Sequence, residues 1–147
     1  MNTFAEKINP SARRKARRFA LQALYQWQIT KQPISEIAVQ YSKEQHMPKA
    51  DVAYFEELLK EIPACHQTLD AQFTSALDRP LAELDPIELT VLRIATYELS
   101  KRIEIPYRVV INEAIELAKE FGAEDGYKYI NGILDQVSKQ LRQVEIR

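Results

Sequence analysis

The chain has 147 residues, of which 46% are hydrophobic and 28% are charged, so a buried core is expected and wholesale disorder is excluded. Its single cysteine, Cys65, excludes an internal disulfide and favours a reducing compartment. The formal net charge of −1 argues, taken alone, against a nucleic-acid partner. No apolar run is long enough to span a membrane or to act as a signal segment, so we expect a cytoplasmic protein.

Apolar residues recur three and four positions apart in the segments between the seven prolines. The pattern predicts about seven helices, the first capped by Ser11, near residues 11–30, 34–41, 52–62, 69–77, 84–101, 111–121 and 130–141. Segment 84–101 is apolar on more than one face, which predicts a central helix. Because no useful strand pattern occurs, we expect one all-α domain over residues 1–147, subdivided near residues 63–67 and flexible over residues 1–10.

Glycine is scarce, and the three glycines all lie in one stretch near the C-terminus. Their spacing fits neither a Rossmann fingerprint nor a P-loop, so a common nucleotide-binding enzyme is not expected. Gly122 stands where a left-handed helix cap is predicted, and Asp125 is a candidate cap for the next helix. Gly132 lies inside a helical pattern, which predicts the close approach of another helix.

The near-zero net charge hides a strong segregation of charge. Residues 1–18, which include Lys7, hold six basic residues and one acidic residue, a net charge of +5, whereas residues 19–147 have a net charge of −6. Five of the cations fall in the first two turns of the first predicted helix, where the helix dipole disfavours positive charge. A phosphate backbone would resolve this conflict.

We therefore expect the start of the first helix to bind a polyanion. Arginine dominates the cluster, which favours bidentate phosphate recognition, and Tyr25 shares a helix sector with Arg14 and Arg18, where a base of single-stranded RNA would stack. The alternatives are a solvated polar face for the cations and a half-buried core position for Tyr25. The candidate RNA-binding residues of this helix are Arg13, Arg14, Lys15, Arg17, Arg18 and Tyr25.

A second candidate surface lies at the start of the last predicted helix. Ile130, Ile133 and Leu134 form its apolar face, so Lys128 and Tyr129 are expected to point elsewhere. A lysine beside an exposed aromatic residue fits phosphate binding and base stacking. The alternative is a tyrosine that only covers the turn.

No pattern of catalytic or metal-ligating residues is apparent. Cys65 and His66 are adjacent and therefore diverge on a helix, and neither His66 nor His46 belongs to a metal-ligand motif. We expect no enzyme activity and no cofactor. The clustered acids Glu83, Asp85 and Glu88 fit the start of a helix, where carboxylates are stabilising.

Two segments resemble the NusB family of bacterial transcription antitermination factors. They are RRKARRFALQALYQW, from Arg13 to Trp27, and VLRIATYELSKRIEIPYRVVINEAIELAKEFGAEDGYKYINGILDQV, from Val91 to Val137. INEAIELAK followed by Tyr129, Asn131 and Gly132 is specific to that family, although Tyr129 replaces the usual phenylalanine. The resemblance implies two packed helical subdomains.

The same resemblance implies binding of boxA, a single-stranded segment of nascent ribosomal RNA, together with the ribosomal small-subunit protein that acts as NusE. The resulting complex helps RNA polymerase to resist termination. Carried over by motif, the RNA contacts fall on Arg13, Arg14, Arg17, Asp125, Lys128 and Tyr129. The acids at Glu83, Asp85 and Glu88 are a candidate surface for the basic ribosomal protein.

Two alternatives belong to other functional classes. One is the substrate-binding module of a ribosomal RNA methyltransferase, which would need a catalytic domain after residue 147. The other is a protein-only assembly module. Because some family members dimerise, a homodimer that covers the arginine cluster is an alternative state of the free protein.

Overall fold

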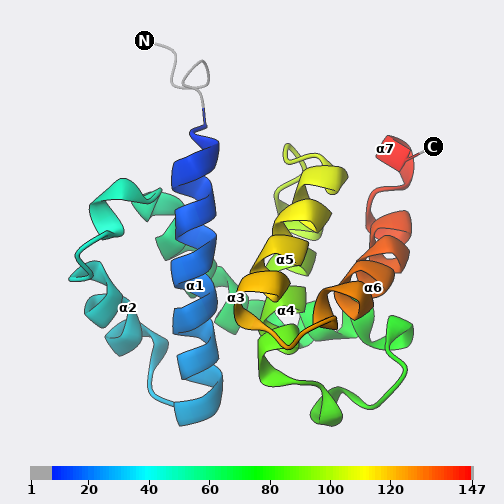
Figure 1. The fold of residues 1–147 in the computed structure, drawn as a ribbon, viewed down its shortest axis with the longest axis horizontal. Helices are drawn as coiled ribbons and strands as arrows, with labels where there is room; N and C mark the ends of the chain where they lie inside the picture. Colours follow the sequence, from blue (N-terminus) through cyan, green and yellow to red (C-terminus); the bar gives the residue numbers. More distant parts are fainter. Residues whose placement is uncertain (1–7, 147) are drawn as a thin grey trace. The chain divides into compact units, whose positions relative to one another are not determined.

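The computed structural model describes residues 8–146, and all regular structure in that range is helical, which confirms the all-α prediction (Figure 1). Residues 1–7, and with them Lys7 and most of the segment expected to be flexible, lie outside the described residues. The contacts divide the chain into two units, unit 1 ending at Lys60 and unit 2 beginning at Glu61, and each is described by itself. None of the helices within residues 8–146 combines the length and the hydropathy that crossing a membrane requires.

Unit 1 is built on the long helix α1 (Pro10–Thr30), which packs against α2 (Ile34–Ser42) and the 3-10 turn η2 (Met47–Lys49). The cap of α1 is Asn9, not Ser11 as predicted: the Asn9 side chain accepts hydrogen bonds from the backbone N–H groups of Ser11 and Ala12 at 3.0 and 3.1 Å. Helix formation therefore begins two residues earlier, with Pro10 in the first turn, where its missing N–H costs nothing.

The segment α3 (Val52–Phe73) consists of two helices joined at a kink, which agrees with the helices predicted near residues 52–62 and 69–77, although the second helix ends at Phe73. It continues through Pro63 with a kink, and the backbone at Cys65 is non-helical, with φ −123° and ψ 20°. A proline inside a helix lacks a donor and crowds the carbonyl one turn earlier, which explains why the chain kinks between the two helices. The 3-10 turns η3 (Thr74–Ala76) and η4 (Leu81–Glu83) follow.

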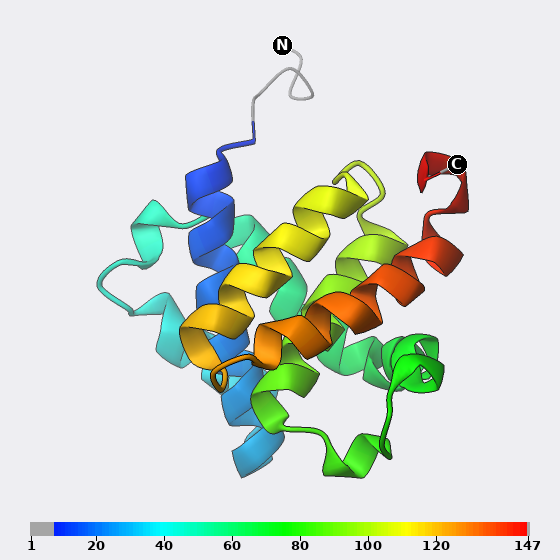
Figure 2. The same cartoon turned by 45° about the vertical axis from the view of Figure 1, so that its right-hand side comes forward.

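Unit 2 is arranged around α4 (Pro86–Lys101), as the sequence predicts. Residues 89–99 of this helix are all buried, and α5 (Tyr107–Phe121) and α6 (Gly126–Leu141) pack on α4 and on one another (Figure 2). Asp85 caps α4 by accepting hydrogen bonds from the backbone N–H groups of Ile87 and Glu88 at 2.8 and 3.2 Å.

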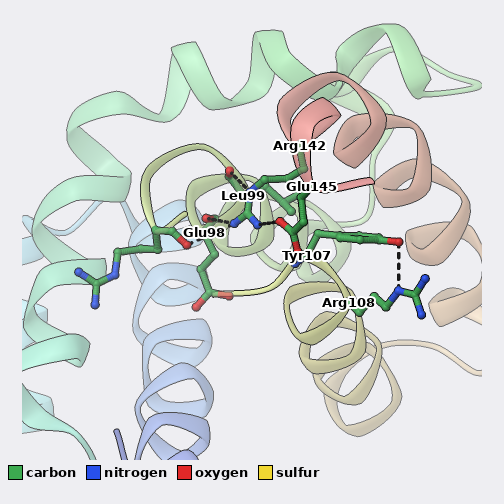
Figure 3. A network of polar contacts seen from close by, with 7 residues as sticks. Glu98, Leu99, Tyr107, Arg108, Arg142 and Glu145 are labelled. Carbon is green, nitrogen blue, oxygen red and sulfur yellow. Dashed lines mark hydrogen bonds and ion pairs between the residues drawn. The ribbon is translucent and has the colours of Figure 1, made fainter. Parts of the chain in front are cut away.

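Arg142 and Glu145, at the short helix α7 (Gln143–Ile146), form hydrogen bonds with the end of α4 and the start of α5 (Figure 3). The buried Arg142 guanidinium donates to the Leu99 carbonyl at 2.8 Å, which lies in the last turn of α4, and to the Glu98 carbonyl at 3.2 Å, which also accepts from the Arg102 backbone N–H. Glu145 binds Arg142 and also accepts from the Tyr107 backbone N–H at 2.9 Å, at the N-terminus of α5. The cap of α5 thus comes from a distant part of the chain, and α5 begins four residues before the predicted start.

The glycine predictions are corrected at two positions. Gly122 is extended, with φ −95° and ψ −177°, so it is not a left-handed cap; a Cβ there would lie 2.8 Å from the Ala118 carbonyl oxygen, which explains the glycine. Within residues 8–146, no atom outside the Gly132 neighbourhood in its own helix lies within 4 Å of its Cβ position, so the predicted close approach of another helix is wrong for the described residues. Asp125 occupies the cap position of α6 with left-handed backbone, φ 68°, but its side chain makes no capping hydrogen bond.

Candidate nucleic-acid interface

The cations of α1 fall into two sets, because successive residues on a helix point about 100° apart. Arg13 and Arg17 are 7% and 4% exposed, whereas Arg14 and Arg18 are exposed and Lys15 is half-buried. Arg13, Arg14 and Arg17 therefore do not form the single exposed ridge that the sequence predicts. Arg13 and Arg17 are buried in unit 1, and only Arg14 is exposed.

The buried set stacks on an aromatic ring of α3. The Arg13 guanidinium lies 3.8 Å from the Tyr54 ring centroid, and that of Arg17 lies 5.7 Å away. Arg13 also pairs with Asp51 at 3.2 Å, and the other Asp51 oxygen accepts from the Tyr54 backbone N–H at 3.1 Å. These contacts fasten α1 to the start of α3, so Arg13 and Arg17 hold the helix that presents the exposed cations.

The exposed set follows one side of α1. Arg14 and Arg18 are one turn apart, and Tyr25, which is half-buried, lies two further turns along the same side. Lys15 donates to the Ser11 hydroxyl at 3.0 Å from a neighbouring position. Unit 1 therefore presents a line of positive charge that continues into an aromatic ring.

In unit 2, the half-buried Tyr129 is held from the loop between η3 and η4. Its hydroxyl donates to Asp78 Oδ1 at 2.8 Å, and the Arg79 guanidinium lies 4.7 Å from the ring centroid. Arg79 also binds both Asp78 oxygens, at 2.7 and 3.1 Å. The hydrogen bond from Arg79, and then the one from Tyr129, lower the pKa of Asp78 to about 2.

Sequence reasoning missed Asp78 and Arg79. They are 51 and 50 positions from Tyr129 along the chain, and an adjacent acid and base in a polar loop give no signal of a distant aromatic partner. Burial is the main cause that raises the pKa of Tyr129, followed by its hydrogen bond to Asp78. Tyr129 is thus an oriented ring with a cation over it, rather than an isolated surface aromatic.

Lys128 and Asp125 are neighbours at the start of α6. Their Nζ and Oδ1 atoms are 3.5 Å apart, and both side chains are about two-thirds exposed, at 66% and 67%. An exposed pair of this kind contributes about 0–1 kcal/mol to stability. Breaking this ion pair to bind a ligand would therefore cost little free energy.

The three acids proposed for a protein partner lie in different surroundings. Glu83 is exposed on η4, whereas the Asp85 carboxylate caps α4. Glu88 is half-buried, and burial, followed by the nearby charge of Asp85, raises its pKa. Its carboxylate approaches the Cβ position of Gly126 to 2.8 Å, which brings the start of α4 against the start of α6.

Cys65 and His66 lie at the kink of α3. Burial raises the pKa of the Cys65 thiol, and His66 Nδ1 lies 2.9 Å from the Pro63 carbonyl oxygen. A raised thiol pKa disfavours the reactive thiolate. Among residues 8–146, no three His, Cys, Asp or Glu side chains are grouped so as to hold a metal ion.

Comparison with known proteins assigns the family. The NusB family model matches residues 14–139. The chain is 53% identical to the transcription antitermination protein NusB of Alcanivorax borkumensis over 136 residues, covering 92% of this chain and 91% of that protein. It is 48% identical to the protein of the same name from Pseudomonas fluorescens over 144 residues, covering 97% of this chain and 87% of that protein.

A solved structure supports the same assignment. The fold matches that of T. maritima NusB with a TM-score of 0.78 and 31% identity, covering 92% of this chain and 94% of that one. Sequence and fold thus agree over nearly the whole chain. The chain belongs to the NusB family of transcription antitermination proteins, which are not enzymes.

Proposed function

We propose that this protein binds the boxA segment of nascent ribosomal RNA in the cytoplasm, jointly with the ribosomal small-subunit protein that acts as NusE, and so joins the complex that keeps RNA polymerase from terminating. The relatives named above are transcription antitermination proteins. Single-stranded RNA is typically held by cations that bind phosphates and by aromatic rings that stack on bases. Exposed cations and half-buried tyrosine rings occur together on α1 in unit 1 and at the start of α6 in unit 2.

The observation that carries the proposal is the exposure of Arg14 and Arg18 on one side of α1, in line with Tyr25. The first turn of α1 contains no acidic residue. Such a line suits successive phosphates, because single-stranded RNA carries one negative charge per nucleotide. In this proposal Lys15 adds a further cation, whereas Arg13 and Arg17 position the helix.

Unit 2 offers a second proposed RNA-binding surface, at the start of α6. Tyr129 stacks on a base, and the orientation of its ring is set by Asp78 and Arg79. Lys128 binds a phosphate, and Asp125 accepts a hydrogen bond from a base edge. Accepting from a base is the contact that suits an acid beside RNA, since a phosphate would be repelled.

Fluorescence anisotropy tests the RNA proposal. A labelled boxA RNA and a scrambled RNA of the same composition are titrated at several salt concentrations. We expect tighter binding of boxA and a log–log salt slope of about −0.7 for each phosphate contact. A flat slope would exclude phosphate contacts as the main source of affinity, and equal binding of the two RNAs would exclude boxA recognition.

Pull-down of the ribosomal partner from RNase-treated material tests the protein contact. Retention without RNA would support a direct contact, for which Glu83 and Asp85 are the exposed acidic candidates. Loss of the partner after RNase treatment would leave RNA as the bridge between the two proteins. Sedimentation of the free protein reports whether it is a monomer or a homodimer.

A further inference from the structure

A pocket of about 270 Å³ opens in unit 1, beside the line of Arg14, Arg18 and Tyr25. It is small compared with the ~300–1,000 Å³ of typical ligand pockets, so its size suits one small group rather than a large cofactor. Six residues line it: Lys15, Arg18, Phe19, Gln22, His46 and Lys49.

Two elements build the pocket. The α1 members recur at intervals of three, four and seven residues, which places them on one side of the helix. His46 and Lys49 come from η2 and the residue before it, where the buried Met47 anchors the opposite wall. The backbone N–H of Asp51 donates to the Ala12 carbonyl at 2.9 Å, and with the Arg13–Asp51 ion pair this fixes the wall to α1.

The chemistry of the lining favours a phosphate next to a base. Lys15, Arg18 and Lys49 are cationic, and none of the six lining residues is acidic. Phe19 contributes a half-buried ring, held edge-on by Tyr41 with 6.5 Å between ring centroids. The Gln22 amide and the His46 imidazole add hydrogen-bonding groups that suit a base or a ribose.

We infer that this pocket binds RNA outside boxA, taking the phosphate and the adjoining base of one flanking nucleotide. The inference rests on the proposed function, because it assumes that RNA lies along α1. Arg18 belongs both to the exposed line and to the pocket, so a strand that follows α1 can enter the pocket without leaving the positive surface. Binding is thereby extended beyond the core element.

The test compares three RNAs, which are the boxA core and the same core extended by a few nucleotides at its 5′ or its 3′ end. Lys49→Ala and His46→Ala alter the wall that is not part of α1, and Lys43→Ala is the matched control at an exposed lysine of the same unit that does not line the pocket. Circular dichroism verifies that each variant is folded.

We expect one extension to raise the affinity of the unaltered protein about five- to tenfold. Lys49→Ala should remove most of this gain and reduce the salt slope for the extended RNA by about 0.7, the value for one phosphate of a single strand. Binding of the core RNA should stay within about twofold, as should every measurement on Lys43→Ala.

The pocket proposal is overturned if neither extension raises affinity, or if Lys49→Ala and Lys43→Ala weaken the extended RNA equally. Failure of the boxA proposal looks different, because the unaltered protein would then bind the core no better than scrambled RNA. Even then, the pocket proposal can be tested with any longer RNA. It is supported if Lys49→Ala lowers the affinity for that RNA more than Lys43→Ala does, and it is overturned if the two variants have the same affinity.

Discussion

Each unit of this protein holds an arginine against a tyrosine ring, and the two pairs differ in burial. In unit 1, Arg13 lies 3.8 Å from the Tyr54 ring and both side chains are buried. In unit 2, Arg79 lies 4.7 Å from the half-buried Tyr129 ring and is itself exposed. A buried pair is held because its loss would strand polar groups away from water, whereas an exposed pair is cheap to rearrange. The same kind of contact therefore stabilises the packing of helices in unit 1, whereas in unit 2 it belongs to the surface that we propose binds RNA.

The largest effect tests the buried pair. Arg13→Ala should lower the free energy of unfolding by about 2–4 kcal/mol, since it removes a charged hydrogen bond and a desolvated cation–aromatic contact. Urea denaturation monitored by circular dichroism measures this change.

Arg79→Ala and Arg14→Ala are the matched controls at exposed arginines. Each should leave the free energy of unfolding close to that of the unaltered protein, because surface substitutions away from buried contacts have little effect. The comparison fails if Arg79→Ala destabilises the protein as much as Arg13→Ala.

The next effect concerns the half-buried ring of Tyr129 in unit 2. Tyr129→Ala should weaken binding of boxA by about 1–3 kcal/mol, the usual contribution of one base stacked on an aromatic side chain. Tyr129→Phe keeps the ring and loses only the hydroxyl bond to Asp78, so its affinity should stay close to that of the unaltered protein. If both variants bind equally weakly, the hydroxyl network rather than stacking is responsible.

A smaller effect is expected for a single exposed cation. Arg14→Ala should lower boxA affinity about three- to tenfold, without loss of helicity, and reduce the magnitude of the salt slope by about 0.7. Titrations at several salt concentrations measure both quantities. An unchanged slope would show that Arg14 does not contact a phosphate.

The smallest effect is a pH dependence at the Asp78 carboxylate. Its pKa is lowered to about 2 in the folded protein, below the ordinary value of about 3.9. A depressed folded-state pKa means that the stabilising contribution is present above pH 4 and is lost as the pH falls towards 2. An NMR titration of the carboxyl carbon should give this low midpoint, and Arg79→Ala should move it upwards. A midpoint near 4 in the unaltered protein would contradict the hydrogen bonding described for Arg79 and Tyr129.

Much of the fold could be predicted from local pattern. The apolar period and the positions of the prolines predicted the helices of both units and the central place of α4, since one face or several faces must be buried. The errors fell where local rules compete. Pro63 does mark the kink between the two helices of α3, as predicted, but the cap of α1 is Asn9 rather than Ser11. Both residue types are good caps, so sequence did not distinguish them.

The candidate site was predictable only in part, because composition shows charge and not exposure. The cluster of cations in α1 was evident, but its division into buried and exposed members depends on Tyr54 and Asp51, which lie on or beside another helix. Lys128 and Tyr129 were found from their place beside an apolar stripe. Their neighbour Arg79 was not, because the contact joins segments 50 positions apart.

The sequence by itself determined the helical class, the segregation of charge and the resemblance to the NusB family, because these depend on spacing and composition along the chain. Only the tertiary structure decided which arginines are buried against Tyr54 and which are exposed. It also decided where the pocket lined by Lys15 and Lys49 forms, and that Glu145 caps α5. Those features depend on contacts between groups that are distant in sequence. The free energy of a buried cation depends on its interaction partners and on its desolvation. Both are set by residues that are distant in sequence, so local sequence patterns do not reveal them.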